Sequence, residues 1–136
     1  FSEINKACQA VLAKGLADMG VLTVSAEESL KPEVGLHRRW TLHGVSHHLG
    51  LDVHDCAQAR KEQYLDAPLR EGMVLTVEPG LYIQPDDELF APEYRGIGIR
   101  IEDDVVVTAD GCRNISENIP RHPDEIEKWM KSVLGR

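Results

Sequence analysis

Apolar residues recur along the chain with two different periods, which predicts a mixed α+β fold. The segment from Pro123 to Leu134 and residues 2–19 both repeat apolar side chains every three or four positions, as on one face of a helix. In residues 2–19 the apolar positions are Ile4, Cys8, Val11, Leu12, Leu16 and Met19, and in the later segment they are Ile126, Trp129, Met130, Val133 and Leu134. We expect two amphipathic helices, the second covering a sheet, and one helical turn from Ala26 to Leu30.

Two stretches rich in β-branched residues predict strands. Residues 73–78 form an apolar run that ends at Glu78. In residues 97–102 isoleucines alternate with polar positions, so we expect the isoleucines to face the core and Arg100 and Glu102 to point together to the other side. That strand continues through 103–107 and turns back at 109–111. Between the two stretches, residues 82–94 carry prolines and the acids Asp86, Asp87 and Glu88, and we expect an exposed loop.

Five of the six histidines fall between His37 and His54, which predicts an active centre there. His43 and His47 are four residues apart and share a face in a helix or in a strand, so spacing leaves both geometries open. The glycines at 44 and 50 weaken a helix interior and favour a short strand with a tight loop. The alternative is a set of surface or hydrogen-bonded core histidines.

Composition narrows the class of protein. The 136 residues suit one domain or a piece of one, and a chain that begins with Phe1 rather than Met suggests that upstream residues have been removed. The formal net charge of −8 argues against a nucleic-acid partner, and no apolar run approaches the roughly 20 residues that cross a membrane. Three cysteines without CxxC spacing argue against a disulfide framework or a thiolate zinc site. We therefore expect a cytoplasmic protein.

The polar residues that interrupt these apolar segments form a candidate metal site. A carboxylate at the end of a buried strand is costly unless it is paired or bound to a cation, which applies to Glu78. Glu78 and Glu102 would supply two carboxylates, and the histidine cluster would supply an imidazole. Such a ligand set suits Mn²⁺, Fe²⁺, Co²⁺ or Zn²⁺. A carboxylate can also bridge two such ions, and the remaining histidines could bind a substrate carbonyl. These residue types point to metal-assisted hydrolysis.

Three ordered motifs in the chain resemble one enzyme family. They are His43-Gly-Val-Ser-His47-His-Leu-Gly-Leu-Asp-Val-His54-Asp, Gly72-Met-Val-Leu-Thr-Val-Glu78-Pro-Gly-Leu-Tyr and Gly96-Ile-Gly-Ile-Arg100-Ile-Glu102-Asp-Asp. They resemble the Xaa-Pro aminopeptidases (aminopeptidase P) of the pita-bread metallopeptidases, a family that also contains prolidase and methionine aminopeptidase. The resemblance implies half of a pita-bread fold, with a curved, mostly antiparallel sheet covered by helices.

The same resemblance implies roles for individual residues. His47, Glu78 and Glu102 match metal ligands, with Glu102 bridging two divalent ions, usually manganese, and Glu78 also taking a proton from the attacking water. His43 and His54 match histidines that position the peptide substrate. Arg100 matches an arginine that supports the residues around the metal ions. The implied reaction releases the N-terminal residue from a peptide whose second residue is proline, in an enzyme that forms homo-oligomers.

The family pattern has five protein ligands, and two aspartates and a further histidine of that pattern are not found in residues 1–136. The resemblance therefore implies that residues 1–136 are the C-terminal portion of the catalytic domain. Its partner would be the missing N-terminal half of the enzyme, and the isolated chain would be inactive. Two alternatives stay open: a prolidase, which cleaves Xaa-Pro dipeptides, and a peptide-binding module on the same fold that has lost catalysis.

Overall fold

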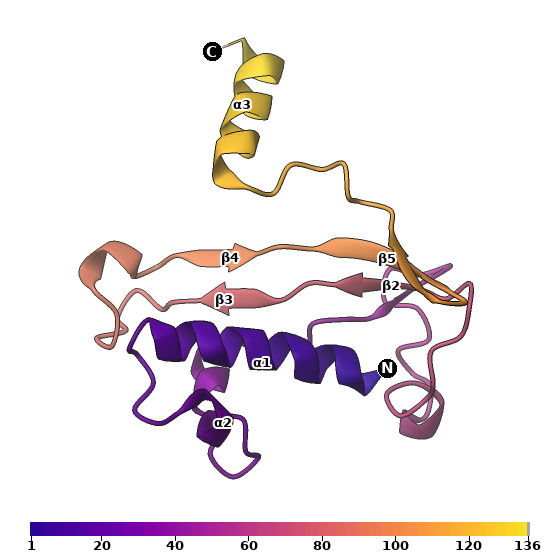
Figure 1. Ribbon diagram of the computed structural model, residues 1–136, viewed down its shortest axis with the longest axis horizontal. Coiled ribbons are helices and arrows are strands. Elements are labelled where there is room, and N and C mark those ends of the chain that lie inside the picture. The colour runs from indigo at the N-terminus through magenta and orange to yellow at the C-terminus, as the bar shows by residue number, and fades with distance from the viewer. Residues whose placement is uncertain (136) are drawn as a thin grey trace.

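A long antiparallel ribbon of two chain segments runs through the computed structural model, which describes residues 1–135 (Figure 1). The helices are α1 (Ser2–Asp18), α2 (Ala26–Ser29) and α3 (Pro123–Leu134), with short 3-10 turns at Leu36–Arg39, Lys61–Gln63 and Pro92–Tyr94. The strands are β1 (His48–Leu49), β2 (Val74–Val77), β3 (Gly80–Tyr82), β4 (Gly98–Arg100), β5 (Asp103–Thr108) and β6 (Gly111–Asn114). The predicted α+β class is confirmed.

The strands form two hydrogen-bonded sheets that continue into each other. The first has the order β1-β2-β5-β6 and the second pairs β3 with β4, all antiparallel. β2 passes into β3 and β4 passes into β5, and the Ile101 N–H donates to the carbonyl of Pro79 between them at 3.3 Å. The predicted turn at 109–111 is the β5–β6 hairpin. The interruption at 78–79 and 101–102 separates the two sheets, so the two candidate carboxylates lie where the regular ladder stops.

The core lies between α1 and β3 (Figure 1). Its centre is a buried cluster of Leu16, Trp40, Ile83 and Phe90, with Val21, Leu22 and Leu81 packed beside it. The rings of Trp40 and Phe90 meet edge to face with centroids 5.5 Å apart, a favoured geometry for aromatic pairs. Helix α1 was predicted correctly, although Val11 and Met19 of its expected stripe are exposed.

The predicted exposed loop at 82–94 is wrong at three positions, because Ile83, Asp87 and Phe90 are buried. The Asp87 carboxylate accepts hydrogen bonds from the indole N–H of Trp40 at 2.7 Å and from Nε of Arg39 at 3.0 Å. It also caps the backbone N–H of Leu89 at 3.0 Å. A buried acid is stable when its oxygens have such partners, so this loop closes one end of the core.

Two further expectations about packing are wrong. Ile97, Ile99 and Ile101 are 43%, 59% and 46% exposed, because α1 lies beside β3 and no described element covers the same face of β4. Helix α3 forms from Pro123 as predicted, yet it has no buried residue and stands away from the sheet (Figure 1). Both apolar surfaces are therefore open in residues 1–135. Within the same residues, no helix is long and apolar enough to cross a membrane.

Replacing Asp87 by alanine leaves the buried indole N–H of Trp40 without an acceptor. We expect Asp87→Ala to lower the free energy of unfolding by about 2–4 kcal/mol, measured by urea denaturation at pH 7. The neighbouring Asp86 is exposed, so Asp86→Ala should change that free energy by less than about 0.5 kcal/mol. Equal effects of the two substitutions would contradict the role given to Asp87.

The same carboxylate predicts a pH dependence of stability. The Arg39 guanidinium, and with it the Trp40 indole, hold the pKa of Asp87 below its ordinary value. A folded-state pKa below the unfolded value of about 3.9 adds stability above that pH, and this stability is lost as the pH falls through the folded value. The stability difference between the wild type and Asp87→Asn should therefore be full at pH 7 and shrink below about pH 4. A stability difference that stays constant across that pH range would contradict the lowered pKa of Asp87 in the folded protein.

Candidate metal centre

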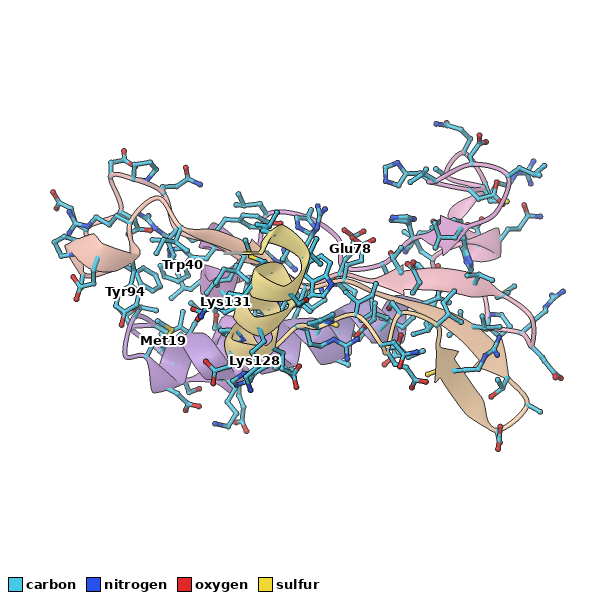
Figure 2. The ribbon with its side chains drawn as sticks, turned by 90° about the horizontal axis from the view of Figure 1, so that it is seen from above. Met19, Trp40, Glu78, Tyr94, Lys128 and Lys131 are labelled. Atoms are coloured by element: carbon cyan, nitrogen blue, oxygen red, sulfur yellow. The ribbon has the colours of Figure 1, made fainter. Side chains whose placement is uncertain are left out.

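Glu78 and Glu102 face each other across the interruption in the ribbon. Val77 pairs with Asp103 on one side of the gap, and Gly80 pairs with Arg100 on the other. In an antiparallel pair this register sets residues 78 and 102 directly opposite, with their side chains on one face. Glu78 is buried and is labelled in Figure 2, whereas Glu102 is exposed.

His47 comes from the segment beside β2, which carries the histidine cluster. Its carbonyl accepts from the Thr76 N–H at 2.9 Å, and its own N–H donates to the Thr76 hydroxyl at 3.1 Å. The same hydroxyl donates to Oε1 of Glu78 at 3.4 Å. The Glu78 N–H in turn donates to the carbonyl of Val45 at 2.7 Å. Thr76 therefore fixes the separation of His47 and Glu78 on that face.

The three predicted ligands converge on one point. One ligand atom from each of His47, Glu78 and Glu102 lies within 4.8 Å of the other two. Nδ1 of His47 lies 3.1 Å from the carbonyl oxygen of His48, which can only accept, so Nδ1 donates this hydrogen bond. Nε2 of His47 lies 3.2 Å from Oε1 of Glu78. In the neutral imidazole this leaves the lone pair on Nε2, which is the form that binds a divalent cation.

Arg100 supplies positive charge at the edge of this cluster. Its Nε lies 3.7 Å from Oε2 of Glu78 and 3.8 Å from Oε2 of Glu102. Both separations exceed hydrogen-bond distance, so the guanidinium contributes charge more than directed bonding. Arg100 was predicted from its place in the 97–102 alternation, and the structure sets it beside both acids.

The five clustered histidines divide into two groups. His37 is buried and bound to Ser29, and His48 packs between Phe1 and Tyr64. Burial lowers the pKa of both imidazoles, as expected for histidines that stay neutral in a core. His37 and His48 therefore match the alternative expectation of packed or hydrogen-bonded histidines. The other three are His43, His47 and His54, the histidines predicted for the site.

His54 contacts the ligand residue His47, and His43 contacts Tyr82 of β3. The His54 ring meets that of His47 edge to face, with centroids 4.4 Å apart. Nε2 of His43 lies 2.7 Å from the hydroxyl of Tyr82. Sequence reasoning did not single out Tyr82. Its spacing from Glu78 could have indicated it, because residues 78, 80 and 82 share one face of an extended chain.

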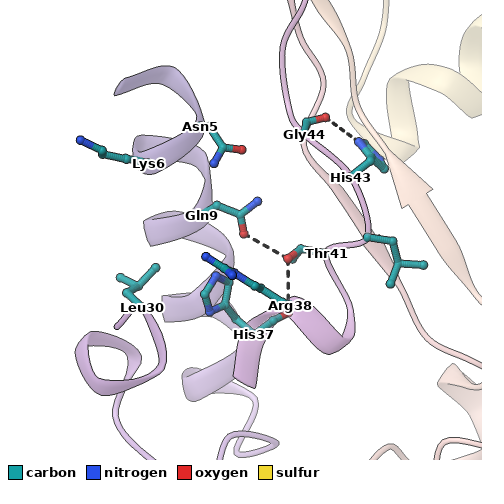
Figure 3. Close-up of a pocket in the computed structure, with 10 residues that line it drawn as sticks. Asn5, Lys6, Gln9, Leu30, His37, Arg38, Thr41, His43 and Gly44 are labelled. Carbon is teal, nitrogen blue, oxygen red and sulfur yellow. Dashed lines mark hydrogen bonds between the residues drawn. The ribbon is translucent and has the colours of Figure 1, made fainter. Parts of the chain in front are cut away.

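A cavity of about 580 Å³ lies between α1 and the segment that leads to His43 (Figure 3). Its lining includes Asn5, Gln9, His37, Arg38, Thr41 and His43. The Thr41 hydroxyl donates to Gln9 at 3.0 Å, which ties α1 to this segment. None of the three ligand residues lines this cavity. Of the predicted site residues, the cavity is therefore lined by His43 and by none of the metal ligands.

Comparison with known proteins places these motifs in one family. Residues 1–109 match the model of "Metallopeptidase family M24". The chain is 56% identical over 135 residues to Xaa-Pro aminopeptidase 1 of Streptomyces coelicolor, and 45% identical over 120 residues to Xaa-Pro aminopeptidase of Escherichia coli. These alignments cover 99% and 88% of this chain, but 27% and 26% of the two relatives.

Solved structures give the same result for the fold. Aminopeptidase PepP of Pseudomonas aeruginosa superposes with a TM-score of 0.87 at 36% identity, covering 100% of this chain and 30% of that one. Aminopeptidase P from E. coli with the inhibitor Pro-Leu gives 0.79 at 42% identity, covering 94% and 28%. The chain thus has the architecture of part of a pita-bread enzyme and spans under a third of the relatives it matches. It belongs to metallopeptidase family M24.

Proposed function

We propose that the protein containing this chain is a metal-dependent Xaa-Pro aminopeptidase. It releases the N-terminal residue from peptides whose second residue is proline. The observation that carries the proposal is the convergence of His47, Glu78 and Glu102 within 4.8 Å, in a chain 56% identical to a relative named for that activity. A peptide-binding module without catalysis has no physical need for three cation ligands on one face.

The donor set suits two divalent cations, for which we propose manganese. His47 and Glu78 would hold one of them, and Glu102 would bridge to the second, because its two oxygens can reach two ions. Nitrogen and oxygen donors with no sulfur match the preferences of manganese. The bound cations would supply Lewis acidity toward a peptide carbonyl and lower the pKa of water at the site.

The protein's own groups handle the proton and the substrate. Glu78 is the acceptor for the proton of the attacking water, since its Oε1 points to the cluster and its backbone is fixed by Val45. His43 and His54 stand on the substrate side, where an imidazole N–H can donate to the oxygen that gains negative charge. Arg100 balances the charge of the two acids.

The remainder of the site lies in sequence beyond these residues. We propose that residues 1–136 are the C-terminal portion of the catalytic domain and that an N-terminal half completes it with further ligands. The open isoleucine face of β4 and the open apolar face of α3 suit burial against that half. We also propose a homo-oligomeric parent in the cytoplasm, where the free thiols of Cys8, Cys56 and Cys112 stay reduced.

Substrate assays on the full-length protein test the proposed activity. With manganese present, an Xaa-Pro-Xaa tripeptide should be cleaved after its first residue, and an Xaa-Ala-Xaa tripeptide should resist. Cleavage restricted to Xaa-Pro dipeptides would instead indicate a prolidase. If the full-length protein also fails to bind two Mn²⁺ in a calorimetric titration, the peptide-binding module would be the better description.

Substitution of a ligand should abolish the reaction. We expect Glu102→Gln in the full-length enzyme to lower kcat/KM for an Xaa-Pro tripeptide by about 100-fold or more, because an amide cannot bridge two cations. Metal content, measured by atomic emission, should fall in parallel. Glu93→Gln removes a carboxylate of the same length from an exposed turn and should leave both values unchanged. Full activity of Glu102→Gln would exclude it as a ligand.

The 136-residue chain by itself should behave differently from its parent. Since it supplies three ligands to a site that we propose needs more, calorimetry with Mn²⁺ should detect fewer than two ions per chain, and peptide hydrolysis should be negligible. Adding the N-terminal half as a separate polypeptide should restore activity. Full activity of the chain alone would refute the proposed division of the site.

A further inference from the structure

We infer that Tyr82 is a positioning residue for His43, holding its imidazole in one orientation and one tautomer through a hydrogen bond. The inference deepens the proposed function and rests on the placement of His43 at the substrate side. The hydroxyl of Tyr82 and Nε2 of His43 are 2.7 Å apart, and their ring centroids are separated by 5.4 Å.

The second ring nitrogen of His43 decides the direction of this hydrogen bond. Nδ1 lies 2.7 Å from the carbonyl oxygen of Gly44, which can only accept, so the proton of the neutral ring is on Nδ1. Nε2 then carries a lone pair and accepts from the Tyr82 hydroxyl. With both nitrogens engaged, the imidazole has one orientation and one tautomer. A histidine that must act on a substrate oxygen gains from having its orientation fixed beforehand.

Two glycines give the Tyr82 ring its place on the sheet. A Cβ at Gly80 would lie 2.5 Å from the Tyr82 hydroxyl oxygen and 2.6–2.7 Å from its Cε2 and Cζ. A Cβ at Gly98, which is paired with Tyr82 across the strands, would lie 2.9 Å from Cδ1. The ring therefore lies flat over both backbones, in space that any other residue at these positions would fill. This packing aims the hydroxyl toward His43.

The backbone of Tyr82 anchors the same segment. Its N–H donates to the carbonyl of Trp40 at 2.9 Å, three residues before His43. Trp40 is buried in the core and held by Asp87. Tyr82 thus contacts the segment at two points, one through its backbone and one through its hydroxyl, and the imidazole of His43 is tied to the core by both.

A spectroscopic experiment on the 136-residue chain tests the role without using activity. Long-range ¹H–¹⁵N correlation spectra report which imidazole nitrogen is protonated. We expect His43 to show the Nδ1–H tautomer alone in the wild type, and a mixture of both tautomers in Tyr82→Phe, which keeps the ring and removes the hydroxyl. The imidazole signals of His37, whose Nδ1 is bound to Ser29 and not to Tyr82, should not move and so report an intact fold.

A glycine pair provides the matched control. Gly80→Ala keeps the hydroxyl but places a methyl group against the ring, so it should reproduce the His43 spectrum of Tyr82→Phe. Gly15→Ala, in open space on α1, should match the wild type. If the wild type already shows mixed tautomers, or if both Tyr82→Phe and Gly80→Ala leave the His43 spectrum unchanged, the positioning role is overturned.

Kinetics of the full-length enzyme separate this inference from the proposed function. If His43 acts on charge that develops during the reaction, Tyr82→Phe should lower kcat and kcat/KM together by about 3- to 10-fold, the effect of one hydrogen bond. A raised KM with unchanged kcat would show that Tyr82 binds substrate directly and would overturn the inference. Absence of Xaa-Pro cleavage in the wild type would refute the proposed function and leave the spectroscopic result standing.

Discussion

The register of one antiparallel ribbon is the constraint on which the rest of the site depends. Val77 pairs with Asp103 and Gly80 with Arg100, and the two acids between them are opposite each other for that reason alone. A slip of one residue would turn every side chain of one strand to the other face. It would separate Glu78 from both Glu102 and Arg100, which lie on the other strand and would move together. Two further backbone hydrogen bonds keep this register, from Ile101 N–H to the carbonyl of Pro79 at 3.3 Å and from Val107 N–H to the carbonyl of Met73 at 2.8 Å.

Much of this arrangement could be predicted from the sequence, because it follows from local rules. Alternation in residues 97–102 places Arg100 and Glu102 on one face, whatever the rest of the chain does. A carboxylate after the apolar run 73–78 needs a partner, whereas the choice of His47 among the clustered histidines rests on the resemblance of the three motifs. The period of α1 likewise follows from its own residues. The predictions for residues 97–102 and for α1 each use the repeat of a single element, two residues for a strand and 3.6 for a helix.

Other features depend on which surfaces meet, and no local pattern gives that. The isoleucine face of β4 and the stripe on α3 look buried by periodicity, yet no element within residues 1–135 covers them. Asp87 lies among prolines and acids and reads as surface, but the tryptophan and arginine that bury it come from a segment 47–48 residues earlier. Tyr82 gains its role only when Gly98, on another strand, gives its ring space.

The half-exposed guanidinium of Arg100 has a consequence for the cluster before any metal binds. Two acids held together in one small region repel each other, and a fixed cation beside both reduces that repulsion. The cluster then carries about one net negative charge rather than two, so it attracts every cation less strongly than two acids alone would. In return, the two carboxylates can lie close together without an ion between them, and their oxygen atoms need little rearrangement to meet an incoming cation.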